Sequence, residues 1–354
     1  MGLPLFTISS SSRQSLPVLL MLALVSSAAV AADDTIRFQV ATTVSPEATK
    51  ALAAIYAVSS RQPPRTKPTS QQDWDRQNEE LDKRMLPASK ALADKLGATV
   101  DDEQIGGVPV VRIRPADYKP NGRALIYLHG GGYTRFTAHS RLGPALLVAA
   151  ATGDEVISID FTDAPKGNWK IVTDQVLSVW RALLAKGTAP ASTGMFGDSA
   201  GGGLAAGSAL KMRDQGLPLP GALYLMSPWA DITDTGDSYL TLLGLDPVIE
   251  RDTSNWNASA YADPTDQKNP YASPVYGDYS KAFPPTLIQG GTREMLLSGF
   301  VREYQAIRRG GHEAVLDLYE GMPHVFQSSI PDTPEARTAL ARAAAFLNEH
   351  LQVR

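Results

Sequence analysis

The chain has 354 residues, of which 43% are hydrophobic and 20% charged, with a formal net charge of -4 and no cysteine. This length suffices for one large α/β domain with an added cap, or for two small domains. The acidic balance and the lack of a long basic run argue against nucleic acid as a partner. The absence of cysteine excludes disulfides, thiolate metal sites and a cysteine nucleophile.

The N-terminal residues 1–32 have the pattern of a secretory signal peptide. Arg13 precedes an apolar run at residues 16–25, and Ala29-Val30-Ala31 fits a small-x-small cleavage site. The alternative is an uncleaved membrane anchor, but the run is short for a bilayer and contains Pro17. We therefore expect cleavage before Asp33, no stable membrane insertion, and export to the periplasm or the medium.

Residues 33–105 are expected to form a polar, helical segment that contributes to a cap. A proline-rich loop at residues 63–68 interrupts it. After the loop, Ser70 and the acidic residues that follow it are typical of a helix start. Apolar residues then recur at roughly helical spacing, including Leu81, Leu92 and Leu96, and Gly97 is expected to end the helix.

From residue 106 to residue 354 the pattern changes to that of a catalytic core. Short β-rich runs alternate with helical stretches. The expected strands are residues 108–113, 124–128, 156–159, 194–197, 223–226, 286–289 and 315–319, and the expected helices are residues 174–186, 200–213, 295–309 and 334–351. This alternation predicts an α/β fold with a mostly parallel central sheet and helices on both of its faces.

Residues 229–280 interrupt the alternation and are rich in Asp, Asn, Pro and Tyr. A connection of this length should have its own structure, so we interpret it as an insertion that completes the cap. Its aromatic side chains, Trp229, Tyr239, Trp256 and Tyr261, are candidates for an acyl or aromatic pocket. Packing is the commoner role of such residues and is the one we expect.

The sequence Gly197-Asp198-Ser199-Ala200-Gly201 fits the G-x-S-x-G pattern. It directly follows an expected strand and directly precedes an expected helix, which is the context that a nucleophile elbow requires. Ser199 is therefore the predicted nucleophile, and the alternative is a glycine-rich turn without chemical use. For Asp198 we favour a structural role over an acid or metal role.

A second motif, His129-Gly130-Gly131-Gly132, immediately follows the strand expected at residues 124–128. This motif is typical of the oxyanion holes of lipases and esterases, where backbone N–H groups stabilise a tetrahedral intermediate. We assign the donors to Gly130, Gly131 and Ala200. The alternative is a flexible loop, and His129 is expected to organise the loop rather than to act as the base.

The catalytic base should be a histidine late in the chain, because this fold orders its triad as serine, acid, histidine. His324 lies in a loop that follows the last expected strand, where a side chain can face the site. His312 precedes that strand, and His350 lies in the expected terminal helix. His324 is therefore the predicted base.

The acid should follow the preceding strand, and Glu294 is the only carboxylate in residues 290–296. A carboxylate there can orient the imidazole and stabilise the imidazolium. The alternatives are an inert glutamate in a helix first turn, or a catalytic role for Asp263, Asp266 or Asp278 in the expected cap. No metal-binding or nucleotide-binding signature is present, so neither a metal nor a cofactor is indicated.

Together these motifs resemble the hormone-sensitive lipase-like family of α/β-hydrolase fold esterases. The resemblance covers roughly residues 105–350 and rests on residues 129–132, 197–202, 227–231, 272–274, 284–288, 291–294 and 324–326. It implies hydrolysis of carboxylic esters with small or medium acyl groups, and a cap built from N-terminal helices and the insertion after the sixth strand. Residues 161–169 depart from the family, which usually has a tyrosine, an arginine and a proline-rich acidic turn there.

The sequence thus predicts a serine carboxylesterase that acts on short- to medium-chain esters through an acyl-enzyme. One alternative is an acyltransferase or amidase that uses the same triad, since the acceptor would be chosen by the cap. Another is a non-catalytic ligand receptor on this fold. The expected partner is a small-molecule ester, and the oligomeric state is not predicted.

Overall fold

The computed structural model describes residues 39–62 and 65–353. The predicted signal peptide lies outside these residues. Eight strands form one sheet in the order β1-β2-β4-β3-β5-β6-β7-β8. The strands are β1 (Thr99–Ile105), β2 (Val108–Arg114), β3 (Ala124–Leu128), β4 (Glu155–Ile159), β5 (Thr193–Asp198), β6 (Ala222–Met226), β7 (Thr286–Gly291) and β8 (Ala314–Tyr319).

Strands β3 to β8 run parallel, whereas β1 and β2 are antiparallel additions at one edge. Every residue of β3, β5 and β6 is buried. Strands that are apolar on both faces need cover on both faces, and this is why they read as continuous hydrophobic runs. The predicted α/β fold with a mostly parallel sheet is confirmed.

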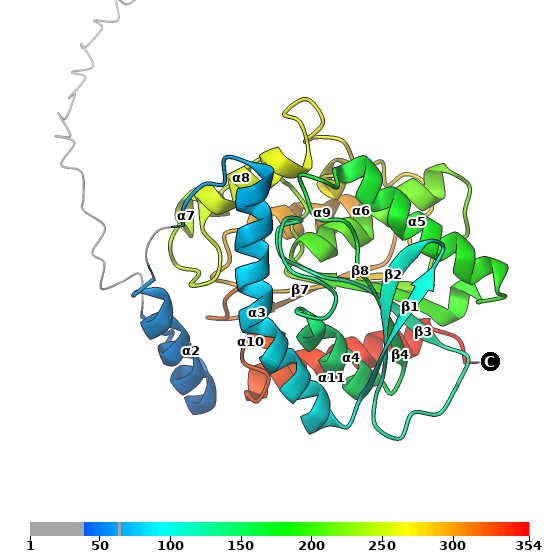
Figure 1. Ribbon diagram of the computed structural model, residues 1–354, viewed down its shortest axis with the longest axis horizontal. Coiled ribbons are helices and arrows are strands. Elements are labelled where there is room, and N and C mark those ends of the chain that lie inside the picture. The colour runs from blue at the N-terminus through cyan, green and yellow to red at the C-terminus, as the bar shows by residue number, and fades with distance from the viewer. Residues whose placement is uncertain (1–38, 63–64, 354) are drawn as a thin grey trace, which may run out of the picture.

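Helices cover the two faces of the sheet (Figure 1). On one face, α5 (Trp169–Ala185), α6 (Ala200–Asp214) and α9 (Leu297–Arg309) pack into one hydrophobic cluster with the sheet. On the other face, α4 (Leu142–Thr152) and α11 (Pro334–His350) form a second cluster. Successive residues of β3 point to opposite faces, so that Leu125 and Tyr127 join one cluster while Ile126 and Leu128 join the other.

Two elements differ from the sequence expectation. Residues 99–105, which fall in the expected cap segment 33–105, form β1 and pair with β2 along their whole length. The turn between these strands has positive φ at Gly106 and Gly107. Because β1 lies at an exposed edge of the sheet, most of its residues are polar. Its sequence therefore does not show the apolar run that marks the other strands. Helix α4 was missed because most of its side chains are apolar, so it has no amphipathic period.

The segments that the sequence assigns to the cap, which we continue to call the cap, contain α2 (Pro46–Ser59), α3 (Gln71–Leu96), α7 (Ser238–Thr241) and α8 (Arg251–Tyr261). As predicted, Ser70 caps the start of α3, and Gly97, with φ 63°, ends it. Helix α2 bonds to the insertion, because Ser59 Oγ donates to the carbonyl of Pro247 at 2.8 Å. Helix α2 and the insertion are therefore in direct contact.

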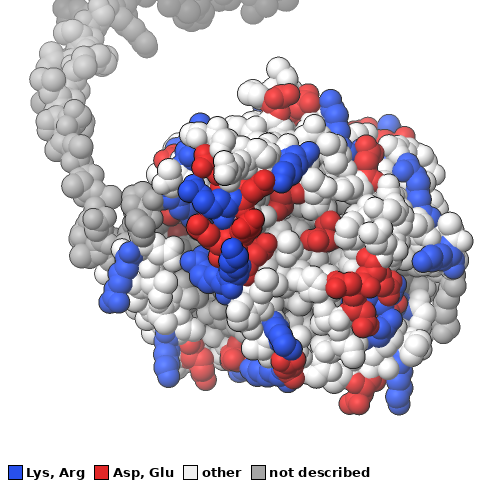
Figure 2. All heavy atoms as spheres, viewed as in Figure 1, with Lys and Arg blue, Asp and Glu red and all other residues white. Residues whose placement is uncertain are grey.

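The shorter elements are two 3₁₀ turns, η1 (Pro190–Ser192) and η2 (Pro274–Tyr276), and the single-turn helix α10 (Phe326–Ser329). Acidic and basic side chains are intermixed over the face seen in Figure 2. Within residues 39–62 and 65–353, none of the helices is both long enough and apolar enough to cross a membrane.

Candidate active site

Ser199 lies at a sharp turn between β5 and α6, with φ 55° and ψ -122°. A non-glycine residue rarely adopts this conformation, which is typical of a strained functional position. The flanking glycines are required by close backbone approach. A Cβ at Gly201 would lie 1.9 Å from the carbonyl oxygen of Leu128, and one at Gly197 would lie 2.3 Å from that of Gly201. The backbone thus fixes the serine at the carboxyl edge of the sheet.

His324 and Glu294 form a direct pair in the loops that follow β8 and β7. Nδ1 of His324 lies 2.7 Å from Oε2 of Glu294, and both side chains are buried. Ser199 and His324 line the same pocket. The structure therefore brings the predicted nucleophile and base to one cavity, with the predicted acid behind the imidazole.

The three aspartates that are alternatives to Glu294 as the acid, Asp263, Asp266 and Asp278, make contacts away from His324. Asp266 accepts a hydrogen bond from Trp169 Nε1, and Asp278 accepts one from Ser280. Asp263 accepts the backbone N–H groups of later residues through its own carbonyl, as part of a turn. None of the three lines the pocket that contains Ser199.

Ser227 is a buried residue at this site to which the sequence pattern assigns no role. Its hydroxyl donates to Oε1 of Glu294 at 2.7 Å and accepts from the N–H of Val325 at 3.1 Å. The same Glu294 oxygen also accepts from the N–H of Gly291. Ser227 therefore joins the end of β6 to the acid and to the residue next to His324. Its position directly after an apolar strand was the available signal.

Asp246 is a second residue that was missed, and it comes from the cap insertion. One of its oxygens accepts from the N–H of His324 at 2.9 Å, and the other accepts from those of Val248 and Ile249. Burial raises the pKa of Asp246 to about 6, against the attraction of His324. No motif marks this residue, because its role arises only when the cap folds onto the core.

Asp246, Glu294 and His324 present three potential ligand atoms within 4.8 Å of one another. Both carboxylates already accept N–H or O–H donors, and Nδ1 of His324 is bonded to Glu294. A cation would have to displace these donors. The chemistry of this group is therefore that of a hydrogen-bonded carboxylate–histidine network.

The structure corrects one of the assigned oxyanion donors. The N–H of Gly130 donates to Oδ1 of Asp198 at 2.9 Å, so it is engaged in holding the loop against the elbow. Gly131 and Gly132 line the pocket, and in the described part of the chain their N–H groups have no hydrogen-bond partner. The same holds for the N–H of Ala200. Gly132 therefore replaces Gly130 as the candidate donor beside Gly131 and Ala200.

The contacts of Asp198 agree with the structural role that we favour for it from the sequence. It is fully buried and accepts from Tyr127 and Gly130, and Arg141 lies 2.6 Å away as an ion pair. Burial opposes its ionisation, but the charge of Arg141 and these hydrogen bonds hold the pKa of Asp198 below its usual value. The carboxylate thereby ties β3, the glycine loop and the elbow together.

His129 is also buried within this loop, and it does not line the pocket. Its Nδ1 lies 2.9 Å from the carbonyl oxygen of Gly130, and its ring stacks on Phe161 at 4.1 Å. Burial lowers the pKa of His129, which keeps it neutral. This arrangement agrees with the loop-organising role, and it shows that residues 161–169, which depart from the family pattern, contact the oxyanion loop.

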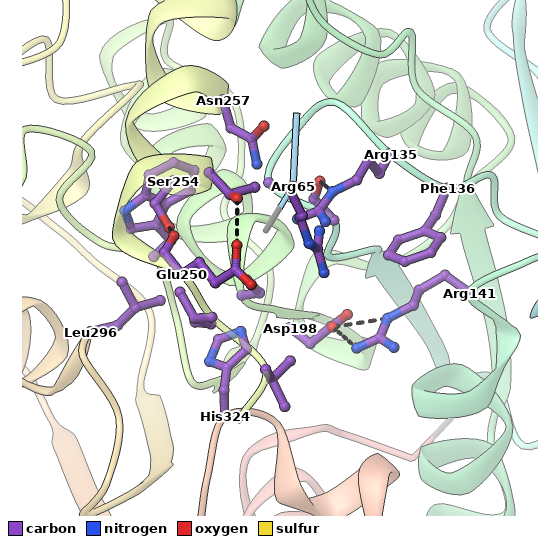
Figure 3. Close-up of a pocket in the computed structure, with 17 residues that line it drawn as sticks. Arg65, Arg135, Phe136, Arg141, Asp198, Glu250, Ser254, Asn257, Leu296 and His324 are labelled. Atoms are coloured by element: carbon purple, nitrogen blue, oxygen red, sulfur yellow. Dashed lines mark hydrogen bonds and ion pairs between the residues drawn. The ribbon is translucent and has the colours of Figure 1, made fainter. Parts of the chain in front are cut away.

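The pocket has a volume of about 150 Å³ and lies between the core and the cap (Figure 3). Of the four aromatic residues of the insertion that are candidates for a pocket, Trp229 alone lines it. Tyr239 and Tyr261 are buried in the core cluster instead. A nucleophilic serine, a histidine paired with a carboxylate, and unbonded N–H donors together suit acyl transfer from an ester.

Comparisons with known proteins agree with this chemistry. A family model described as the α/β hydrolase fold matches residues 125–328. An acetyl-hydrolase of Streptomyces hygroscopicus is 31% identical over 278 residues, which cover 78% of this chain and 92% of that protein. An esterase of Acinetobacter venetianus is 29% identical over 69% of this chain and 81% of its own length.

Solved structures give the same result. The crystal structure of esterase E25 has a TM-score of 0.78 and 30% identity, covering 89% of this chain and 99% of its own. An esterase from the bacterial hormone-sensitive lipase family has a TM-score of 0.76 and 28% identity, covering 87% of this chain and 99% of its own. This chain therefore belongs to the α/β-hydrolase fold family, among the bacterial esterases of the hormone-sensitive lipase type.

Proposed function

We propose that this protein hydrolyses short- to medium-chain carboxylic esters through an acyl-enzyme formed on Ser199. The observation that carries the assignment is the 2.7 Å pair of His324 and Glu294, which shares a pocket with a serine in the strained elbow conformation. The acyltransferase, amidase and receptor alternatives have no support among the relatives, which are named as esterases, acetyl-hydrolases and lipases.

In the proposed mechanism, Ser199 attacks the ester carbonyl while Nε2 of His324 accepts the hydroxyl proton. The negative charge that develops on the carbonyl oxygen is stabilised by the N–H groups of Gly131, Gly132 and Ala200. Glu294 keeps Nδ1 of the imidazole protonated, so that Nε2 is the free base. The proton then passes to the leaving alcohol.

Water repeats these steps on the acyl-enzyme, with His324 again as the base and then as the acid. The small pocket suits a short acyl chain, and its Trp229 wall is apolar. The proposed preference is therefore for short acyl groups, with turnover falling as the chain lengthens.

The direct test measures hydrolysis of p-nitrophenyl esters of increasing acyl length by the mature protein and by Ser199→Ala. We expect turnover in the parent and a loss of several orders of magnitude in the variant, as triad residues act as a unit. Labelling by a fluorophosphonate probe in the parent alone would locate the reactive serine. Equal turnover in both proteins would contradict the assignment.

The N-terminal pattern supports a second proposal, that residues 1–32 direct export and are removed. Expression of the full chain in a bacterial host, followed by mass determination of the protein in the periplasmic and culture fractions, tests it. A mature N-terminus at Asp33 is the expected result. A full-length protein confined to the cytoplasm would contradict it.

A further inference from the structure

The pocket beside Ser199 is lined by more charge than the hydrolysis of a neutral ester requires. Three arginines, Arg65, Arg135 and Arg141, line it together with two carboxylates, Asp198 and Glu250. These groups leave the lining with an excess of positive charge. Arg141 is accounted for by its ion pair with Asp198 at 2.6 Å.

Unlike Arg141, Arg135 and Arg65 have no ion-pair partner among the described residues. No carboxylate lies within ion-pair distance of either guanidinium among the described residues, although both groups face the pocket (Figure 3). Nε of Arg135 donates to the carbonyl oxygen of Gly131 at 3.3 Å, and within the same residues no other hydrogen bond holds its guanidinium. Burial, and then repulsion by Arg65 and Arg141, lower the pKa of Arg135 to about 9.

An unpaired cation in a partly dehydrated pocket is unfavourable, and a bound anion would relieve that cost. Arg135 remains cationic at neutral pH, since its lowered pKa still lies well above 7. A guanidinium can bind a carboxylate with two parallel hydrogen bonds, which gives both affinity and orientation. The unpaired guanidinium groups of this pocket are therefore suited to bind a carboxylate.

The position of Arg135 also sets where that carboxylate would lie. Gly131 offers its N–H as a proposed oxyanion donor, while its carbonyl holds Arg135. The guanidinium is thus anchored to the residue that would contact the scissile carbonyl. In a pocket of about 150 Å³, a carboxylate bound there must be only a few bonds from the ester.

We propose that this esterase acts on small esters that carry a carboxylate near the scissile carbonyl, and that Arg135 and Arg65 bind that carboxylate. The inference rests on the proposed function and names its substrate class. Glu250 faces the same pocket from the start of α8, where it accepts a hydrogen bond from Thr253 Oγ1 at 3.2 Å. The negative charge of Glu250 opposes the binding of an anion. Replacing Glu250 by glutamine should therefore favour anionic esters, whereas replacing either arginine should disfavour them.

The experiment compares kcat/KM for monoethyl succinate with that for ethyl pentanoate, a neutral ester of similar length, by titrating the released acid. A third substrate, 3-acetoxypropionate, places the carboxylate on the alcohol side and so tells which part of the ester the arginines bind. Acetylcholine serves as the cationic counterpart. The variants are Arg135→Gln, Arg65→Gln and Glu250→Gln, with the exposed Arg181→Gln as the matched control.

We expect the parent to cleave at least one anionic ester as well as ethyl pentanoate or better. The ratio of anionic to neutral kcat/KM should fall tenfold or more in Arg135→Gln, mostly through KM, and should fall less in Arg65→Gln. It should rise in Glu250→Gln and stay constant in Arg181→Gln. High salt should reduce the ratio in the parent, because screening weakens the attraction.

Ser199-dependent turnover of ethyl pentanoate, with both anionic esters cleaved a hundredfold more slowly, would overturn this inference while leaving the esterase function intact. An unchanged ratio in Arg135→Gln would overturn it as well. A preference for acetylcholine would identify Glu250 as the recognition group instead. Absence of Ser199-dependent turnover of all esters, including the p-nitrophenyl series, would remove the proposed function itself.

Discussion

Replacing Glu303 by glutamine should remove a pH-dependent loss of stability. Glu303 lies on α9 and is fully buried, and in the described part of the chain its Oε2 has no hydrogen-bond partner. Its Oε1 is 3.5 Å from the hydroxyl of Tyr279, whose proton is already donated to the carbonyl of Pro274 at 2.9 Å. Burial raises the pKa of Glu303 from 4.5 to about 8, so the folded protein prefers the neutral carboxyl.

The sign of the effect follows from the raised pKa. Between pH 4.5 and about 8 the unfolded chain binds fewer protons at Glu303 than the folded protein does, so the stability declines as the pH rises. The contribution is fully present below pH 4.5 and is lost as the pH passes through about 8. Each pKa unit corresponds to about 1.4 kcal/mol, so roughly 4 kcal/mol should be lost between about pH 5 and pH 9.

Glutamine has the same shape, and its amide can donate to the Tyr279 oxygen as the neutral carboxyl does, but it does not ionise. Thermal unfolding of the parent and Glu303→Gln should therefore give similar Tm values near pH 5. Near pH 9 the variant should be more stable by about 8 °C, since 1 kcal/mol shifts Tm by roughly 2 °C at this size. The exposed Glu349→Gln is the matched control. Parallel Tm curves for the parent and Glu303→Gln would refute the argument.

Three further substitutions test the hydrogen-bond network around the triad. Ser227→Ala removes a hydrogen-bond donor to Glu294, and one such bond contributes roughly 1–2 kcal/mol. We therefore expect kcat to fall about tenfold with little change in KM, and an unchanged kcat in the p-nitrophenyl assay would contradict this. Asp198→Asn leaves the charge of Arg141 unpaired and should destabilise the protein by about 3–5 kcal/mol, visible as a large drop in Tm. The pKa of Asp246 is raised to about 6, so the parent should lose stability as the pH rises from about 4 to 7, whereas Asp246→Asn should lose less. A Tm difference between the two proteins that stays constant over this pH range would argue against this.

The parts of the fold that follow from local rules could be predicted from the sequence. The buried strands were found because a short apolar run bounded by turn residues is consistent with a buried strand and these runs alternate with helical stretches, and α3 was found because Ser70 and Gly97 mark its ends. The elbow and the glycine loop were found because their glycines are demanded by backbone contacts as close as that of Gly201 with Leu128. In each case the signal lies within a few consecutive residues.

The parts that were missed depend on contacts between distant segments. Strand β1 is recognised only through its pairing with β2, because its own residues are polar. The wrong oxyanion donor arose because the sequence does not show that Asp198 accepts the N–H of Gly130 across 68 positions. Asp246 lies 78 residues from His324 in the chain, and no local pattern predicts their contact.

Three buried carboxylates hold this site together, and each joins segments that are remote in the sequence. Asp198 joins the elbow to the glycine loop, Glu294 joins β7 to the histidine loop, and Asp246 joins the cap to that same loop. Carboxylates suit this task because each oxygen accepts more than one donor, although burying them is unfavourable unless the donors are in place. It follows that the cap is not an independent lid near His324. A displacement of Asp246 away from the core would break its hydrogen bond to the N–H of His324, and the bonds from Val248 and Ile249 hold the Asp246 carboxylate in the insertion, so the insertion contributes directly to the position of the histidine loop.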